Sequence, residues 1–160
     1  MASKARRRLI TDYKKMMKLD NFSIHAEPDE NNMLEWYAVI LGPDDTDWEG
    51  GLFKLSLEFT EEYPNKPPSV KFNTPMYHPN IYNNGKICLD ILQKEWTAVY
   101  DVSAVLVSIQ QLLTDPNPDS PANSEAAKLF VDDREAYNDK VRECVTNSFF
   151  VEATNSEEGS

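Results

Sequence analysis

The sequence predicts an α+β fold in which helices flank an antiparallel sheet. All ten prolines lie between Pro28 and Pro121, so helix-compatible segments stand at the two ends of the chain and a turn-rich region lies between them. Four short runs of aromatic and β-branched residues follow one another closely in the first half, a spacing typical of an antiparallel meander. A length of 160 residues and a hydrophobic content of 41% suit one compact domain.

The first helix is predicted over Ser3–Lys18. Apolar residues recur there at every fourth position and predict one buried stripe, consisting of Ala5, Leu9, Tyr13 and Met17. The strands are predicted between Pro-Asp, Gly-Pro, Gly-Gly and Pro-Pro breaks. Their expected bounds are Phe22–Ala26, Glu35–Leu41, Leu52–Phe59 and Val70–Phe72.

A central packing helix is predicted to begin after Asp101 and to end before Pro116, because aspartate is a good N-cap and proline ends a helix. Its apolar face consists of Val102, Val105, Leu106, Ile109, Leu112 and Leu113. Two further helices are predicted over Ser124–Val131 and Arg134–Phe149. One side of the last helix is apolar and consists of Tyr137, Val141, Cys144 and Val145. We therefore expect Cys144 in the core, as a small hydrophobic residue.

The net charge of −11 is unevenly distributed along the chain. Residues 1–18 carry seven Lys and Arg against Asp12 alone, and the remainder is strongly acidic. Direct binding to nucleic acid is not expected, because the chain lacks a continuous basic surface. The run from Arg6 through Arg7 to Arg8 fits either a solvated helix face or a surface that docks a partner.

Neither a membrane span nor a metal centre is expected. No apolar stretch approaches the roughly eighteen residues that a span needs, and the charged amino terminus lacks an apolar signal segment. We therefore expect a protein of the cytoplasm and nucleus, with reduced thiols. His25 and His78 are the only histidines and Cys88 and Cys144 the only cysteines, so a metal site lacks ligands and a disulfide framework is implausible.

Cys88 stands apart from these structural patterns, in the stretch "YHPNIYNNGKICLDIL". It follows an Asn84-Gly85 turn signal with no helical or alternating pattern to bury it, so we expect it to be exposed. The nearest charges, Lys86 and Asp90, roughly offset one another, and nothing obvious increases the thiolate fraction. Such a thiol is poorly suited to attack an unactivated amide but suffices for exchange with a thioester. The alternative is an exposed cysteine without a chemical role.

The stretch "HPNIYNNGKICLDIL", in which Asn80 precedes Cys88 by eight residues, resembles the active-site signature of ubiquitin-conjugating enzymes. Further motifs of the family follow in its order and spacing, and together they cover nearly the whole chain. These are "WEGGLFKLSLEF" at Trp48–Phe59, "EEYPNKPPSVKF" at Glu61–Phe72, Trp96, and "DPNPDSPAN" at Asp115–Asn123. The segments "ARRRLITDYKKM" and "DPNPDSPAN" further resemble the DNA-repair and histone-ubiquitinating branch of the family.

The resemblance implies a fold and a reaction. The fold is the UBC fold, a four-stranded antiparallel meander packed on a central helix, with an N-terminal helix and two C-terminal helices. In the reaction, Cys88 accepts ubiquitin from the activating enzyme as a thioester and passes it to a substrate lysine. ATP is consumed upstream by the activating enzyme, and no bound cofactor or metal takes part. Residues 1–150 then form the catalytic domain, and residues 151–160 form a short acidic tail that we expect to be disordered.

The resemblance also assigns roles around Cys88. Asn80 is a candidate donor to the oxyanion of aminolysis, or alternatively a residue that holds the loop. His78 is assigned to loop structure, because a base there would also hydrolyse the thioester. Tyr82, Asp119 and Ser120 match the positions that shape the environment of the attacking lysine. Ser120 departs from members with an acid at this position, so either Asp119 compensates, other groups steer the lysine, or phosphorylation of the hydroxyl installs the charge. A plain turn is the alternative for this segment.

Partner surfaces follow from the same resemblance. Arg7 and Arg8 are expected to meet the activating enzyme, and Arg8 also matches a position that meets RING-type ligases. The other expected ligase contacts are Asn65, Lys66, Trp96, Thr97 and Ala98. Ala98 departs from the proline of many members and frees the loop. We expect a monomer, with histone as a candidate substrate.

Three other functions remain open at this stage. The chain could conjugate another ubiquitin-like modifier, such as SUMO. It could be a non-catalytic ubiquitin-binding variant, although such variants lack the cysteine that is present here as Cys88. It could also be a cysteine hydrolase, in which His25 or His78 would have to reach the thiol as a base.

Overall fold

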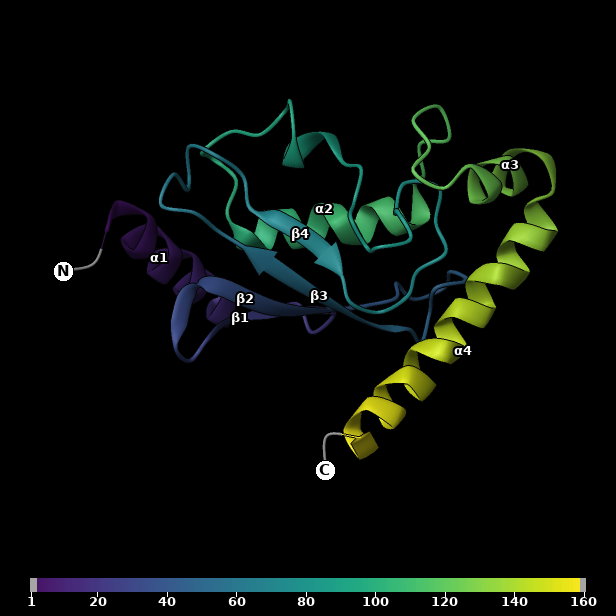
Figure 1. The fold of residues 1–160 in the computed structure, drawn as a ribbon, viewed down its shortest axis with the longest axis horizontal. Helices are drawn as coiled ribbons and strands as arrows, with labels where there is room; N and C mark the ends of the chain where they lie inside the picture. The colour runs from purple at the N-terminus through teal and green to yellow at the C-terminus, as the bar shows by residue number, and fades with distance from the viewer. Residues whose placement is uncertain (1–2, 159–160) are drawn as a thin grey trace.

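The computed structural model describes residues 3–158 and shows an antiparallel sheet flanked by helices (Figure 1). Its helices are α1 (Lys4–Lys18), α2 (Val102–Thr114), α3 (Ser124–Asp132) and α4 (Arg134–Glu158), with a short 3-10 turn, η1 (Asp90–Leu92), ahead of α2. Its strands are β1 (Ile24–Asp29), β2 (Asn32–Leu41), β3 (Leu52–Glu58) and β4 (Ser69–Phe72). Strands that are neighbours along the chain pair antiparallel, in the order β1-β2-β3-β4. The predicted α+β fold and its meander are confirmed.

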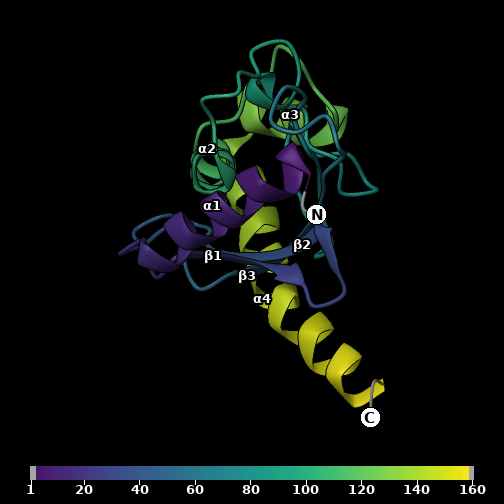
Figure 2. The same ribbon diagram turned by 90° about the vertical axis from the view of Figure 1, so that its left-hand side faces the viewer.

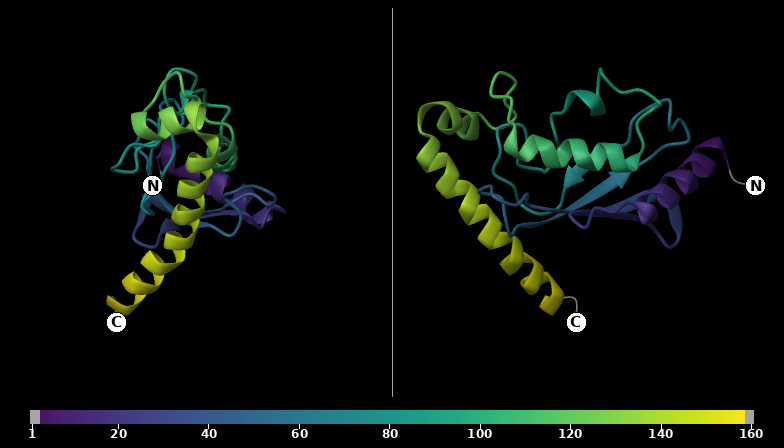
Figure 3. Two further views of the ribbon diagram at one scale, coloured as in Figure 1. Left: turned by 90° about the vertical axis from the view of Figure 1, so that its right-hand side faces the viewer. Right: turned by 180° about the vertical axis from the view of Figure 1, so that it is seen from behind.

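The core lies between the sheet and α2, which crosses one face of the sheet (Figure 3, right). Burial alternates along the strands, as a half-covered sheet requires. Leu55 at the centre of β3 is fully buried and pairs with Ala38 on β2 and Phe72 on β4. α2 begins at its predicted cap, because the Asp101 side chain accepts a hydrogen bond from the Ala104 amide at 2.8 Å. The apolar face predicted for this helix is the face that is buried.

α1 begins after Ser3, whose side chain accepts a hydrogen bond from the Arg6 amide at 3.2 Å. Its buried residues are Ala5, Leu9, Asp12 and Met16. The predicted stripe is therefore wrong at its end, since Met17 is 67% exposed. A helix turns by about 100° per residue, so a spacing of four drifts by about 40° at each step and leaves the buried face after two steps.

The first strand differs from its predicted bounds of Phe22–Ala26. Phe22 lies in a turn and is 93% exposed, because the Asn21 side chain accepts hydrogen bonds from the amide and the hydroxyl of Ser23 and closes a local turn. At its other end β1 runs on through Pro28 to Asp29, where the register shifts. Proline is tolerated there because β1 is an edge strand.

α4 continues past its predicted end at Phe149, and that boundary was wrong. No proline or glycine occurs between Arg134 and Glu158 to stop the helix. The helix therefore includes residues 151–158 of the predicted tail, and its carboxyl end extends beyond the sheet (Figure 2). Residues 159 and 160 of that tail lie outside the described part, and the division into domain and tail stays a prediction. Among the residues that the structure describes, no helix is long and apolar enough to cross a membrane.

A buried carboxylate fixes α1 to the loops on either side of it. Asp12 is fully buried and accepts hydrogen bonds from the Tyr63 hydroxyl and from Nε of Arg8, the latter at 2.9 Å. Nη2 of Arg8 also donates to the Tyr100 carbonyl at 2.9 Å, and its guanidinium lies 5.8 Å from the centre of the Tyr63 ring. Burial, and then the hydrogen bond to Asp12, raise the pKa of Tyr63, so its hydroxyl stays protonated and donates.

We predict that Tyr63→Phe lowers the free energy of unfolding by about 1–3 kcal/mol, because it leaves a buried carboxylate without one of its donors. The matched control is Tyr37→Phe, since the Tyr37 hydroxyl donates to Glu35 on the exposed face of the sheet. That change should stay within about 0.5 kcal/mol. Urea denaturation of both variants measures the difference, and equal losses would contradict a stabilising role for the Tyr63 hydroxyl.

Candidate active site

The loop that carries Cys88 is anchored by the predicted Asn84-Gly85 turn. Gly85 has a φ of 91°, and a Cβ at this position would lie 2.0 Å from the Phe72 carbonyl oxygen, so the turn requires glycine. The Phe72 amide donates to the Gly85 carbonyl at 2.8 Å and ties the turn to β4. Ile81 before the turn and Ile87 after it form an isolated bridge, and both are buried. Cys88 follows directly after this anchor.

Cys88 is partly exposed, and its backbone is fixed by Asn80. The Cys88 amide donates to the Asn80 carbonyl at 2.8 Å. The residue is intermediate in burial, so the predicted exposure is confirmed only in part. No group of three or more His, Cys, Asp and Glu side chains that could hold a metal ion occurs within residues 3–158.

The Asn80 side chain is buried, with 1% of its surface exposed, and all of its amide is hydrogen-bonded. Its Nδ2 donates to the carbonyls of Asn117 at 2.7 Å and Ser120 at 3.1 Å. Its Oδ1 accepts from the Asn117 amide at 2.7 Å. An asparagine side chain has two N–H donors, and both are used here. In this conformation the amide joins the Cys88 loop to residues 115–123, which is the loop-holding alternative.

His78 is built into the loop as a neutral imidazole. It is fully buried, Nε2 donates to the Leu112 carbonyl at 2.7 Å, and Nδ1 accepts from the Asn80 amide at 2.9 Å. Burial lowers the pKa of His78 from 6.5 to about 4, so the ring carries no charge at neutral pH. Because both nitrogens are engaged, His78 has no free lone pair for a proton, as its assignment to loop structure requires. His25 lies on the exposed face of β1, 3.6 Å from Glu27.

The three residues expected to shape the lysine environment are exposed. Tyr82 stands on the loop before Cys88, where its amide donates to the Lys86 carbonyl at 2.9 Å, and its side chain is 47% exposed. Asp119 and Ser120 lie on the segment that Asn80 holds. The far end of that segment is fixed by the Pro79 carbonyl, which accepts hydrogen bonds at 2.7 and 3.0 Å from the next two amides after Pro121. The Pro79 carbonyl and the Asn80 side chain therefore join the loop of Tyr82 and Cys88 to the segment of Asp119 and Ser120.

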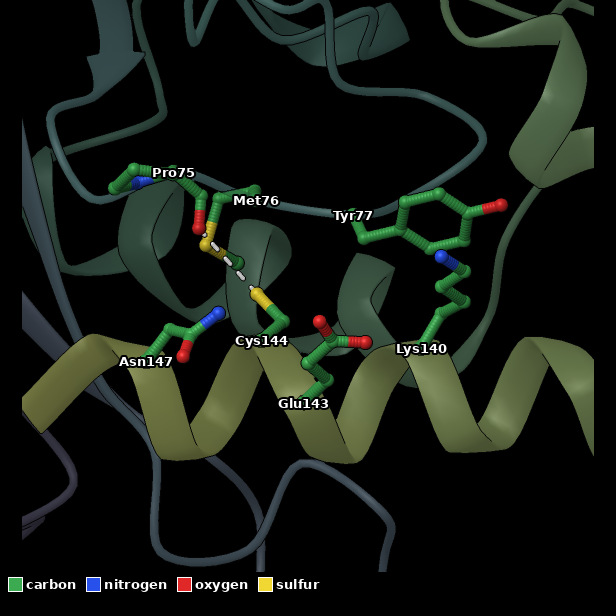
Figure 4. A pocket seen from close by; sticks show the side chains of 7 residues that line it. All are labelled: Pro75, Met76, Tyr77, Lys140, Glu143, Cys144 and Asn147. Carbon is green, nitrogen blue, oxygen red and sulfur yellow. Dashed lines mark hydrogen bonds between the residues drawn. The ribbon is translucent and has the colours of Figure 1, made fainter.

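Cys144 lies in the core, as the sequence predicted. It is 8% exposed, and its thiol donates to the Pro75 carbonyl at 3.3 Å across the gap between α4 and the segment before His78 (Figure 4). A surface cavity of about 230 Å³ opens beside it, with Lys140 and Asn147 on its α4 side. Burial raises the pKa of the Cys144 thiol, which keeps it protonated and unreactive. Both cysteines are free.

Comparison with protein families matches residues 8–145 to the family described as "Ubiquitin-conjugating enzyme". The chain belongs to the ubiquitin-conjugating enzyme family. It is 56% identical to the protein named "Ubiquitin-conjugating enzyme E2 3" of Arabidopsis thaliana over 149 residues, which span 93% of this chain and 99% of that protein. It is 53% identical to "Ubiquitin-conjugating enzyme E2 1" of Caenorhabditis elegans over 149 residues, which span 93% of this chain and 78% of the relative.

In this conjugating enzyme, the residues expected at partner surfaces fall into two groups. Exposed side chains are Arg7, Asn65, Lys66, Thr97 and Ala98. Two others are committed to internal contacts, Arg8 to Asp12 and Trp96 to the Pro64 carbonyl, to which its Nε1 donates at 2.9 Å. The second contact joins the loop of Asn65 to the loop of Thr97. Through these hydrogen bonds and that of Arg8 to the Tyr100 carbonyl, Arg8 and Trp96 hold the loops that carry these exposed residues.

Three residues with structural contacts in the conjugating enzyme were not predicted from the sequence: Asp12, Tyr63 and Asn117. Asp12 could have been predicted, because it stands three residues after Leu9 and four before Met16, within the buried face of α1. An acid in that position predicts a buried partner. Asn117 could not have been predicted, since it binds Asn80 through its backbone and its residue type does not indicate that contact.

We predict that this conjugating enzyme loses stability on acidification through His78. The pKa is about 4 in the folded state and 6.5 without the protein environment, so below pH 6.5 protonation favours the unfolded chain. The contribution is complete above pH 6.5 and is lost towards pH 4, on the order of 3 kcal/mol in total. Urea denaturation from pH 7.5 to 4 should give a shallower pH dependence for His78→Gln than for the parent. The exposed His25→Gln should follow the parent, and a slope unchanged in His78→Gln would contradict this assignment.

Proposed function

We propose that Cys88 carries the carboxyl end of ubiquitin as a thioester and that residues 115–123, held by Asn80, shape the transfer to lysine. The family membership makes the chain an acyltransferase with ubiquitin, an activating enzyme and a ligase as partners in general. The observation that supports Cys88 is the contrast between the two cysteines. Cys88 is accessible and stands in the family's motif, and Cys144 is buried in the core.

The proposed reaction has two steps that balance without a cofactor on this chain. In the first, the Cys88 thiolate attacks the thioester of the activating enzyme, whose own thiolate leaves. In the second, the amine of a lysine attacks the Cys88 thioester, an amide forms, and the Cys88 thiolate leaves. ATP is consumed before either step, by the activating enzyme. A weakly activated thiol suffices because the acyl group arrives activated.

Two roles for Asn80 remain compatible with its contacts. Loop support is the role that the amide performs in the described conformation, since both N–H groups bind carbonyls. Oxyanion stabilisation requires one N–H to turn from its acceptor to the reacting carbonyl. The bond to the Ser120 carbonyl, at 3.1 Å, is the longer of the two and is the one we expect to yield.

Three exposed side chains are candidates to contact the attacking lysine of the substrate: Tyr82, Asp119 and Ser120. A lysine has a solution pKa of about 10.4 and must lose a proton before it attacks. We propose that the Tyr82 ring desolvates the ammonium, which lowers its pKa, and that Asp119 orients it. Ser120, exposed on the same segment, provides a hydroxyl where phosphorylation would add a second negative charge.

We further propose a place for this enzyme within the family. Its amino-terminal basic run and "DPNPDSPAN" segment support the DNA-repair and histone-ubiquitinating branch, with histone as a candidate substrate in the nucleus and cytoplasm. Arg7 fits the docking of the activating enzyme, and Asn65, Lys66, Thr97 and Ala98 fit a RING-type ligase, because all are exposed. The enzyme acts as a monomer.

Charging tests the carrier. With activating enzyme, ATP and ubiquitin, we predict that Cys88→Ser forms an oxygen ester that survives thiol reductant, whereas the adduct of the parent is cleaved by it. Cys88→Ala should form no adduct. Cys144→Ala is the matched control and should charge like the parent, because its thiol is buried. Gel electrophoresis with and without reductant reads the result, and charging of Cys88→Ala would place the carrier elsewhere.

Discharge to free lysine separates Asn80 from Tyr82. We predict that Asn80→Ala still charges but discharges roughly 10²-fold more slowly at every pH, the scale of losing one oxyanion donor. Tyr82→Ala should be slow at pH 7 and recover towards pH 10, because alkaline solvent performs the deprotonation that the ring assists. Single-turnover rates from pH 7 to 10 measure both.

The control for this pair is Asn83→Ala, an exposed asparagine on the same loop, which should leave the rates unchanged. Full recovery of Asn80→Ala at high pH would move Asn80 to lysine deprotonation. An unchanged rate would remove it from the transfer step.

A further inference from the structure

Both carbonyls that accept hydrogen bonds from the Asn80 amide belong to residues that directly precede a proline. Asn117 is followed by Pro118, and Ser120 is followed by Pro121. Nδ2 of Asn80 donates to these two carbonyls at 2.7 and 3.1 Å. The spacing "N-P-D-S-P" thus places two acceptors of the same kind around one buried amide.

The residue before a proline has a restricted backbone. Its contact with the proline ring excludes the helical region and holds it extended, and the ring fixes the φ of the proline itself. The carbonyl between the two residues therefore has few orientations, even in an unfolded chain. Residues 115–123 lie between the end of α2 and the start of α3, and no helix or strand is described within them. A turn helps to hold the Asn117 carbonyl, which also accepts a hydrogen bond from the Ser120 amide at 3.4 Å.

The rest of the segment is held by other means. At its far end the amides of Ala122 and Asn123 donate to the Pro79 carbonyl, and the Asn123 side chain caps α3 by accepting from the Ala126 amide at 3.1 Å. At its near end the Asp115 amide donates back to carbonyls of α2. Pro118 and Pro121 neither donate nor accept any of these hydrogen bonds, and their local effect falls on the two acceptor carbonyls.

We propose that Pro118 and Pro121 are positioning residues for the transfer of ubiquitin to lysine. They restrict the orientations of the Asn117 and Ser120 carbonyls. The side-chain amide of Asn80 can then bind both carbonyls with little further loss of backbone entropy. The same contact sets the segment of Asp119 and Ser120 against the loop of Cys88. This inference rests on the proposed role of Cys88 as the carrier.

The size of the effect follows from the freedom that each proline removes. Pro118→Ala or Pro121→Ala should each slow single-turnover discharge to free lysine roughly two- to fivefold, with charging of Cys88 unchanged. The double variant should be slowed roughly 4- to 25-fold. Because the defect concerns orientation and not protonation, its ratio to the parent should stay constant from pH 7 to 10.

The decisive measurement repeats the two substitutions in the Asn80→Ala background. Without the Asn80 side-chain amide, the carbonyls of Asn117 and Ser120 lose the donor that their orientation serves. Each proline substitution should then alter the rate of discharge by less than about twofold. Pro43→Ala is the control, since Pro43 lies outside residues 115–123 and the residue before it, Gly42, offers no acceptor to Asn80; it should leave the rate unchanged. Urea midpoints of all variants separate a local effect from a loss of global stability.

The inference is overturned if the proline variants discharge like the parent, if Pro43→Ala slows the reaction equally, or if the defects persist in full without the side-chain amide of Asn80. Failure of the parent to charge on Cys88 is a different result, because it refutes the proposed carrier before transfer is reached.

Discussion

Burying one carboxamide imposes a strict requirement on its surroundings, and the region around Cys88 is organised to meet it. The Asn80 side chain has two donors and an acceptor out of contact with water, and each must find a partner or cost free energy. The partners come from a segment 37 and 40 residues further along the chain. A buried amide thereby orders two loops that have no regular secondary structure, and the backbone of the same residue fixes Cys88.

His78 extends this arrangement into the core. Its ring accepts from the backbone N–H of Asn80 and donates to the Leu112 carbonyl near the end of α2. One neutral imidazole therefore joins the loop to the central helix. A protonated ring could not accept from Asn80, and burial disfavours that state. The layer of sheet and α2 thus supports the Cys88 loop through a buried and neutral side chain.

The elements of the fold were predictable because each is encoded locally. Asp101 and Ser3 cap their helices, and Asn84-Gly85 turns the chain, through contacts within a few residues. The errors arose where the sequence contains no residue that ends a helix, or where the assumed spacing of apolar residues did not match the helical repeat. Met17 was misplaced by a spacing of four, and α4 passed Phe149 because nothing in the sequence breaks it. The identity of Cys88 came from its motif. The contacts around Cys88 were not predictable, because every residue has a backbone carbonyl and the residue type does not indicate which carbonyl, such as that of Asn117, accepts a hydrogen bond.

The hydrogen bond from the Cys88 amide to the Asn80 carbonyl occupies the backbone donor of the cysteine itself. If Cys88 carries a thioester as proposed, this N–H is withheld from the oxyanion that forms when either water or an amine attacks it. Neither hydrolysis nor transfer then gains a donor from the backbone of the carrier residue. The bond that holds the loop in shape therefore leaves the stabilisation of that charge to other groups, in this chain or in a partner.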